Sequence, residues 1–442
     1  MNSFSANHIV RIVSGLVLLA FLALPARAIE IKRVVSPGGI TAWLVEDHTN
    51  PLLAMNFSFS SGSSTDPVDR VGVANFLSGM LDEGAGDLDS AAFQKRRDEL
   101  AFRLSFDAGR DFFEGSFETL TRNREASVEL LRKAITGPRF DPEPLERVRQ
   151  QILLAARNRN DDPQQLAVSA WMEAALPGDP YAADPSGTEA TVAVISADDL
   201  RAAHHRIFNR NSLQIAVVGD ITAAELSLIL DRVFGALPNT DDGLEPAPAS
   251  LAPGPRLKVI QRDIPQTVLI FGHEGIRRSD PDFIPAYIMS EILGGGGFNS
   301  RLTGEIREKR GLTYGVGAGF SPMVRVGLFI GSLSTRNEKA AEALGVIREV
   351  LAKMAEEGPS AEELQDAKTY LTGSYALRFT GSRAIAGQLL GLQQQGLGIG
   401  YVETRNSLIE AVTLDQVRAQ AKRLLHPDKL IVTAVGKPEG LN

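Results

Sequence analysis

The sequence of 442 residues contains no cysteine. This absence excludes disulfide bonds, thiol catalysis and thiolate metal sites. Histidine is scarce too, and the six histidines nowhere form the i, i+4 pair that lets two imidazoles on one helix share a zinc ion. His204 and His205 are neighbours, and on a helix they point about 100° apart. We therefore expect no metal bound by this chain.

Positive charge is also in short supply. The chain has 46 Lys and Arg against 54 Asp and Glu, a formal net charge of −8. Nucleic-acid binding usually requires a basic surface, so we expect no nucleic-acid partner. Beyond the N-terminus the sequence lacks any apolar run long enough to span a bilayer. Hydrophobic residues make up 43% of the chain, which is ample for the cores of two or three domains.

The N-terminus has the pattern of a cleavable secretory signal. Arg11 precedes an apolar run over residues 12–24, and Pro25-Ala-Arg-Ala28 follows as an A-x-A end. The run is short for a transmembrane helix, which needs about 20 apolar residues. We expect residues 1–28 to be removed and the mature chain to start at Ile29 in a bacterial periplasm, with no stable membrane anchor. An uncleaved anchor is the alternative.

The chain contains an internal duplication. Residues 195–219 align without a gap on residues 412–436, at a constant offset of 217. Both copies are typical of a capped amphipathic helix, a short turn and a buried strand that ends in glycine. A second similarity, in the same order, pairs residues 113–116 with residues 329–332. The sequence therefore predicts two units of one design.

A proline-rich stretch separates the two units. Residues 239–256 contain four prolines and an Asp-Asp-Gly turn without periodicity, which indicates a linker. The linker divides the mature chain into domains at 29–238 and 257–442. Strands grouped between runs of helices indicate an α+β fold. In the first unit we expect strands over 40–46 and 52–60, and helices over 71–83, 89–100, 123–136, 142–158 and 196–208.

One segment carries a family resemblance. Residues 72–84 read Gly-Val-Ala-Asn-Phe-Leu-Ser-Gly-Met-Leu-Asp-Glu-Gly. This segment resembles the zinc helix of the insulinase/pitrilysin-type metallopeptidases, G-x-A-H-F-L-E-H-M-x-F-x-G. Its apolar frame is present, but Asn75, Ser78 and Gly79 stand where the family has two histidines and a glutamate. The resemblance covers essentially the whole mature chain and implies two similar domains, each a mainly antiparallel sheet packed by several helices.

The resemblance also locates the distal zinc ligand. In active members a glutamate pair falls where this chain has Leu154 and Ala155, before Asp161-Asp-Pro. All the zinc and general-base positions, Ala155 included, are thus replaced together. The resemblance implies a chain without zinc of its own.

A second family motif is retained in the C-terminal half. Residues 298–314 resemble the family block (F/N)SRLFxxIREKxGLxYxV, whose arginine and tyrosine correspond to Arg307 and Tyr314. In the family the tyrosine donates a hydrogen bond to the oxyanion that forms at the scissile carbonyl, and the arginine holds the substrate backbone. We expect Gly311 to end a helix, a strand to start near Leu312, and Tyr314 to lie at a sheet edge. The alternative is that Arg307 is a surface charge and Tyr314 half-buried packing.

Four glycines precede this block. The run Gly294, Gly295, Gly296 and Gly297 follows a helical pattern rather than a strand, which argues against a phosphate-binding loop. In related processing peptidases the noncatalytic subunit uses a glycine-rich loop to handle substrate, and the resemblance implies the same role here. A simple helix end is the alternative.

These observations predict a noncatalytic, substrate-binding subunit of a periplasmic zinc metallopeptidase. The expected partner is a zinc-bearing paralogue, in a heterodimer or a dimer of heterodimers, and the expected substrate is an unfolded peptide. Arg307 and Tyr314 would complete the partner's zinc site. The alternative is a structural or peptide-binding scaffold of the same family without a role in catalysis.

Overall fold

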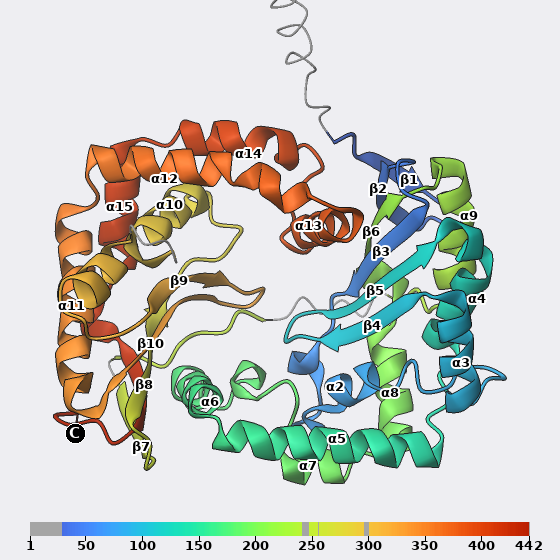
Figure 1. The fold of residues 1–442 in the computed structure, drawn as a ribbon, viewed down its shortest axis with the longest axis horizontal. Helices are drawn as coiled ribbons and strands as arrows, with labels where there is room; N and C mark the ends of the chain where they lie inside the picture. The colour runs from blue at the N-terminus through green and yellow to red at the C-terminus, as the bar shows by residue number, and fades with distance from the viewer. Residues whose placement is uncertain (1–28, 241–246, 255, 296–299, 442) are drawn as a thin grey trace, which may run out of the picture.

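The computed structural model describes residues 29–240, 247–254, 256–295 and 300–441. The expected signal peptide therefore lies outside the described residues. The described chain forms a six-stranded and a five-stranded sheet. Figure 1 shows these sheets at opposite sides of the molecule, with α5 and α6 bridging one side and α12, α14 and α13 the other. No helix in these ranges is long and apolar enough to cross a membrane.

The first sheet has the strand order β1-β2-β6-β3-β5-β4, and β2–β6 is its parallel pair. Its strands are β1 (Lys32–Val35), β2 (Thr41–Glu46), β3 (Leu52–Phe59), β4 (Arg103–Ala108), β5 (Phe113–Leu120) and β6 (Leu213–Gly219). The helices of this half are α2 (Val73–Ser78), α3 (Ser90–Leu100), α4 (Arg124–Thr136), α5 (Pro142–Asp161), α6 (Pro163–Ala175), α7 (Glu189–Ala193), α8 (Ala197–Ile207) and α9 (Ala223–Phe234).

The second sheet has the order β7-β11-β8-β10-β9, with β7–β11 as its parallel pair. Its strands are β7 (Arg256–Gln261), β8 (Gln266–Glu274), β9 (Val316–Pro322), β10 (Gly327–Arg336) and β11 (Ile431–Gly436). The helices are α10 (Phe283–Gly294), α11 (Ala340–Glu357), α12 (Ala361–Gly373), α13 (Ser382–Gln394), α14 (Tyr401–Glu410) and α15 (Leu414–Leu424). The α+β prediction with mainly antiparallel sheets is confirmed.

The internal duplication appears in the structure as matched elements. Helices α8 and α15, and the ends of β6 and β11, are separated by the offset of 217. The second similarity also has a structural meaning. A Cβ atom at Gly115 would lie 2.1 Å from the Phe57 ring, and one at Gly331 would lie 2.4 Å from the Phe271 ring. In each sheet, therefore, only glycine leaves room for the phenylalanine on the neighbouring strand.

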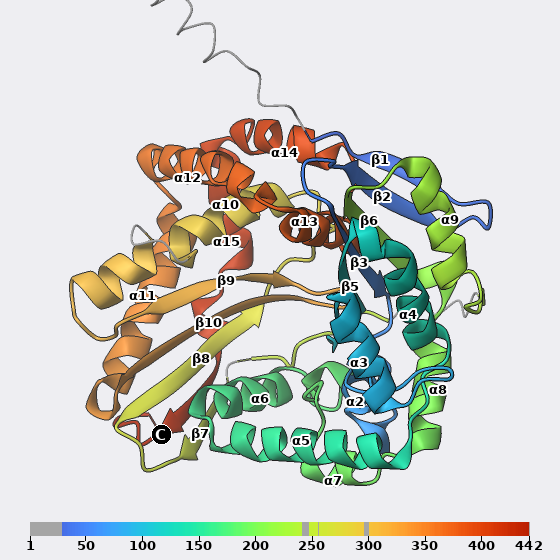
Figure 2. The ribbon, with the colours of Figure 1, turned by 45° about the vertical axis from the view of Figure 1, so that its right-hand side comes forward.

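Each half of the chain covers the sheet of the other half with one helix. Helix α6 packs on β11, β8 and β7, and α13 packs on β6 and β3. Figure 1 shows both helices between the sheets, and Figure 2 shows the same arrangement after a turn of 45°. Strands β6 and β11 are buried along most or all of their length, as strands covered on both faces must be. The pattern of apolar residues in the sequence indicates that these strands are buried. It does not indicate that each sheet is covered by a helix from the other half.

Polar contacts, one of them buried, hold the exchanged helices in place. Trp171 of α6 is fully buried, and its Nε1 donates to the Ile431 carbonyl of β11 over 2.9 Å. On the other side, Gln393 of α13 donates to the Ile215 carbonyl of β6 over 3.0 Å. A further cross-link comes from the β9–β10 turn, where Arg325 makes two 2.8 Å bonds to the Asp179 carboxylate.

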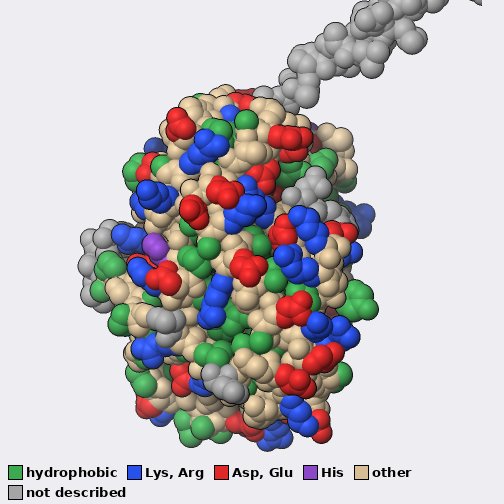
Figure 3. All heavy atoms as spheres, turned by 90° about the vertical axis from the view of Figure 1, so that its left-hand side faces the viewer, with side chains coloured by type: hydrophobic (Ala, Val, Ile, Leu, Met, Phe, Trp, Pro, Cys, Tyr) green, Lys and Arg blue, Asp and Glu red, His purple; other side chains and the backbone are tan. Residues whose placement is uncertain are grey.

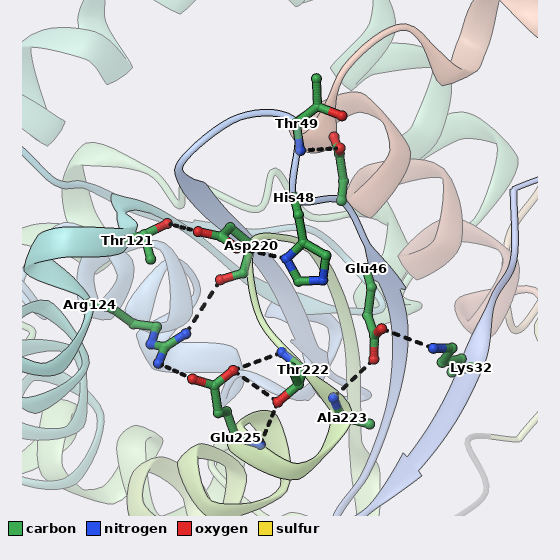
Figure 4. A network of polar contacts seen from close by, with 11 residues as sticks. Lys32, Glu46, His48, Thr49, Thr121, Arg124, Asp220, Thr222, Ala223 and Glu225 are labelled. Atoms are coloured by element: carbon green, nitrogen blue, oxygen red, sulfur yellow. Dashed lines mark hydrogen bonds and ion pairs between the residues drawn. The ribbon is translucent and has the colours of Figure 1, made fainter.

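A polar network closes the end of the first sheet (Figure 4). Asp220, just after β6, accepts from His48 over 2.7 Å and from Thr121 over 2.9 Å. Arg124 of α4 donates to the Asp220 carbonyl and pairs with Glu225 of α9 at 2.6 Å. The hydrogen bond from the Thr222 backbone, followed by the Arg124 contact, lowers the pKa of Glu225 to about 2. The network therefore ties β2, β5 and β6 to the two helices behind them.

Helix α2 is shorter than the sequence predicts. We expected helix over 71–83, but α2 ends at Ser78, and the chain continues in tight turns such as Glu83 N to Met80 O. Glycine at position 79 favours this end because it costs more backbone entropy in a helix than other residues.

A buried carboxylate fixes the start of α2. Asp66 accepts from Gly72 N at 2.9 Å and from Ala74 N at 3.4 Å, and lies 3.2 Å from Arg206. Burial raises the pKa of Asp66 to about 6, although these donors favour the charged form. The backbone entering α2 is thus held by a group that titrates near neutral pH.

We expect Trp171→Ala to destabilise the protein by about 3–5 kcal/mol, because it empties a large buried site and removes a buried hydrogen bond. Chemical denaturation followed by circular dichroism measures this loss. Hydrogen exchange should speed up in β8 and β11, although the substitution lies in the other half. As a control, Leu228→Ala at a 68% exposed position should change stability by less than about 0.5 kcal/mol. An unchanged rate of hydrogen exchange in β11 would contradict the packing of α6 on the sheet of the other half.

Asp66 should make stability depend on pH between about 4 and 6. Its folded pKa is raised, so its contribution is fully present below the unfolded value of 3.8 and is lost as pH rises through about 6. Two pKa units correspond to a difference on the order of 3 kcal/mol. Asp66→Asn keeps an acceptor for Gly72 but cannot titrate. The difference between the unfolding free energies of the wild type and of this variant, measured against pH, isolates the contribution of Asp66. Two curves of unfolding free energy against pH that run parallel would refute this prediction.

Candidate functional site

The replaced zinc positions share one face of α2. Asn75, Ser78 and Gly79 are partly exposed, whereas the apolar frame around them is buried. The Ser78 hydroxyl donates to the Asn75 carbonyl over 2.7 Å, so its hydrogen bond is made within the same helix. A Cβ atom at Gly79 would lie 3.2 Å from Val148 on α5, which leaves little room for a larger side chain.

Helix α5 carries the position of the distal ligand. Ala155 lies seven residues, or two turns, beyond Val148 and therefore on the same face. Ala155 is exposed, and the neighbouring Leu154 is 58% exposed. Amide, hydroxyl, hydrogen and methyl groups at positions 75, 78, 79 and 155 do not form a zinc ligand set. The residues present do not fit the metal that the family resemblance implies for active members.

The histidines have structural roles instead. His204 bonds the Ile135 carbonyl over 2.7 Å, and burial lowers its pKa. His273 is 2% exposed and stacks on Phe329, and burial lowers its pKa to about 4. Within the ranges that the structure describes, no group of three or more His, Asp or Glu side chains could hold a metal ion.

Arg307 lies in a π-helical segment, Thr303–Glu308, that follows the glycine run. Its side chain is about one-third exposed and lies 3.5 Å from Glu308. Gly311, three residues after the segment, turns the chain with a positive φ of 59°. The Gly311 amide donates to the Arg307 carbonyl, and the Leu312 amide donates to the Ile306 carbonyl, both over 3.0 Å. Glycine at this turn therefore fixes the backbone on which Arg307 sits.

Tyr314 stands on a clamped loop before the edge strand β9. The expected strand near Leu312 begins only at Val316, because Thr313 and Thr335 hold the loop first. The Thr313 hydroxyl donates to the Ser334 carbonyl over 2.7 Å, and Thr335 donates to the Leu312 carbonyl over 2.6 Å. Tyr314 itself is 90% exposed. A fixed backbone thus presents a phenol to solvent.

A cavity of about 460 Å³ adjoins Tyr314. Its walls are the start of β9, the end of β10, Gln266 of β8 and Gln164 of α6. None of the replaced zinc positions lines it. Sequence reasoning missed Gln164, because the residue belongs to the other half of the chain and reaches this cavity only through the helix exchange. No local motif marks it.

The glycine run lies partly within the described structure. Gly294 is the last residue of α10, and Gly295 follows it. A Cβ atom at Gly294 would lie 2.7 Å from the Ala318 carbonyl oxygen, so glycine allows α10 to approach β9 closely. Gly296 and Gly297 lie outside the described residues. For Gly294 the structure provides a packing reason, and the loop role stays a prediction.

Two family models match consecutive parts of the chain. The model described as "Insulinase (Peptidase family M16)" matches residues 42–189, and that described as "Peptidase M16 inactive domain" matches residues 195–371. The first match contains α2 and Ala155, and the second contains Arg307 and Tyr314. The matches thus cover both the replaced zinc helix and the retained motif.

Whole-chain relatives agree with these matches. A crystal structure of a peptidase M16 inactive domain from Pseudomonas fluorescens is 30% identical, with a TM-score of 0.87, over 93% of this chain and 100% of that one. The non-peptidase homolog YmxG of Helicobacter pylori is 24% identical over 91% of this chain and 93% of its own length. An uncharacterized zinc protease of Mycobacterium leprae is 26% identical over 91% of both chains. The chain therefore belongs to peptidase family M16, the insulinase family, as a noncatalytic homologue.

Proposed function

We propose that this chain is the noncatalytic, substrate-binding subunit of a periplasmic heterodimeric zinc metallopeptidase. A zinc-bearing paralogue supplies the metal and the general base. Arg307 and Tyr314 of this chain act on an unfolded peptide in the partner's site. The residues at 75, 78, 79 and 155 do not fit zinc, so hydrolysis by a zinc mechanism needs a second chain.

The presentation of Tyr314 is the observation that carries this proposal. The phenol is 90% exposed, although the loop beneath it is fixed by Thr313 and Thr335. No described residue accepts a hydrogen bond from its hydroxyl. A donor held in place before the reaction stabilises a developing oxyanion without reorganisation. Packing alone gives no reason to hold a tyrosine outside the core in this way.

The edge strand β9 suits an extended peptide. Its outer edge has no partner strand among the described residues, so a peptide can add a strand there by backbone hydrogen bonds. The cavity beside Tyr314 and a second one of about 300 Å³ along Gly317 and Gly319 leave room for its side chains. Such backbone recognition favours unfolded segments with little dependence on sequence.

Export to the periplasm is part of the proposal. It rests on the apolar run and the A-x-A end of residues 1–28, which lie outside the described residues. We expect protein purified from the periplasm to begin at Ile29. Mass spectrometry of the intact chain measures this. Recovery of the full 442 residues from the cytoplasmic fraction would refute export.

Tyr314→Phe should lower the turnover of the mixed complex about 100-fold. Removal of one oxyanion donor costs about 10²–10³ in kcat, and the partner's zinc chemistry would remain. The assay mixes this chain with its zinc-bearing paralogue and follows cleavage of an unstructured fluorogenic peptide. Because Tyr314 is exposed, the thermal stability of the chain should not change.

Tyr370→Phe provides the matched control, since Tyr370 is 58% exposed on α12, away from the cavity beside Tyr314. This control should retain full turnover. If Tyr314→Phe does not change the kcat of the complex, the chain is a scaffold without a role in catalysis. Zinc-dependent cleavage by this chain alone would overturn the noncatalytic assignment.

A further inference from the structure

A third cavity, of about 310 Å³, combines arginines with aromatic rings. It lies where α13 meets α10, α14 and the end of β9, and all its lining residues belong to the C-terminal half. Three arginines line it, Arg278, Arg378 and Arg405, together with Tyr375 and Phe283. Among the described lining residues there is no aspartate or glutamate.

The three arginines are not neutralised by salt bridges. Arg405 is only 5% exposed, and its guanidinium donates to the neutral Leu371 carbonyl and the Asn406 amide. Arg278 donates to the Gln395 amide over 3.0 Å. Arg378 has an electrostatic attraction to Glu291 but no salt bridge to a described residue. Of the three, Arg405 is buried, Arg278 is partly exposed and Arg378 is exposed. Because a buried guanidinium without a counter-charge is costly, we expect an anion beside Arg405 to complete the site.

Charge pairing elsewhere makes this cluster stand out. The chain as a whole is acidic, with a net charge of −8. On the face at the left of Figure 1, shown in Figure 3, acidic and basic side chains are interspersed. Arg301 and Arg325, for example, each pair with a carboxylate at 2.7–2.8 Å. Three arginines around one cavity without a lining acid are thus not a general feature of this surface.

Tyr375 adds an unused donor to the same cavity. Its side chain is 8% exposed, and its hydroxyl has no hydrogen-bond partner within the described structure. The Arg405 guanidinium stacks 4.1 Å from the centre of its ring. Burial raises the pKa of Tyr375, which keeps the phenol protonated as a donor. Most buried hydroxyls have partners, so an orphan one calls for a ligand.

Aromatic rings make up much of the remaining wall. Phe283, with Arg278 at 4.4 Å from its centre, stacks parallel to Tyr287, and Phe320 of β9 also lines the cavity. Guanidinium forks match carboxylate and phosphate oxygens, and the rings favour a flat apolar group. We propose that this cavity binds a small organic anion in which a carboxylate or phosphate is joined to an aromatic or apolar body.

The test uses the purified chain alone, so its result does not depend on the peptidase partner. Calorimetry measures binding of phenyl phosphate, 3-phenylpropionate, inorganic phosphate and neutral benzyl alcohol. We expect both aromatic anions to bind, inorganic phosphate to bind more weakly and benzyl alcohol not to bind. Added salt should weaken binding of the anions. The two aromatic anions distinguish a phosphate ligand from a carboxylate ligand.

Two variants locate the site. Tyr375→Phe and Arg378→Gln should each weaken binding of the preferred anion about tenfold, because each removes a hydrogen bond to a charged group. Tyr375→Phe should leave the melting temperature unchanged or raised, since it deletes a buried hydroxyl without a partner. Arg348→Gln on α11 makes the same charge change outside the cavity and should not affect binding.

Three results would overturn the proposal. One is no binding of either aromatic anion at millimolar concentration. Another is equal binding of benzyl alcohol, or tighter binding of inorganic phosphate than of phenyl phosphate. The third is a loss of affinity in Arg348→Gln as large as that in Tyr375→Phe and Arg378→Gln.

Discussion

The structure depends on the reciprocal exchange of α6 and α13. Strands β6 and β11 bury apolar side chains on both faces, and the helices of their own half cover only one. The second face of each sheet is completed by a helix from the other half, held by Trp171 and Gln393. Neither half could bury its sheet alone, so the two sheets keep a fixed relation to each other.

This constraint also creates the cavity beside Tyr314. Gln164 of α6 closes the space beside Tyr314, and α13 closes the arginine cavity. The space beside Tyr314 lies where a helix of one half meets elements of the other, whereas the arginine cavity is lined by the C-terminal half alone. A duplicated fold with exchanged helices thus produces a surface beside Tyr314 that neither copy has by itself.

Local pattern and family resemblance together predicted much of the fold. Periodicity gave the helices near 89–100, 123–136 and 142–158, and the offset of 217 marked the matched helices α8 and α15. The exchange could not be predicted, because an apolar face shows that it is buried but not which segment covers it. For the same reason the arginine cavity left no signal, since Arg278 and Arg405 lie 127 positions apart. The replaced zinc-site positions 75, 78 and 79 could be recognised in the sequence because they lie close together along the chain.

Helix α2 shows that structure and chemistry are separable on one element. Its apolar frame, with Met80 and Leu81 just after the helix, is almost completely buried and supports the core of the first half. Asn75, Ser78 and Gly79 lie on the partly exposed face, where replacement removes zinc ligands without opening a void. Asp66 still holds the start of the helix. The fold therefore does not depend on zinc ligands at these positions. Tyr314, in the other half, is exposed, so its presence does not disturb the core either.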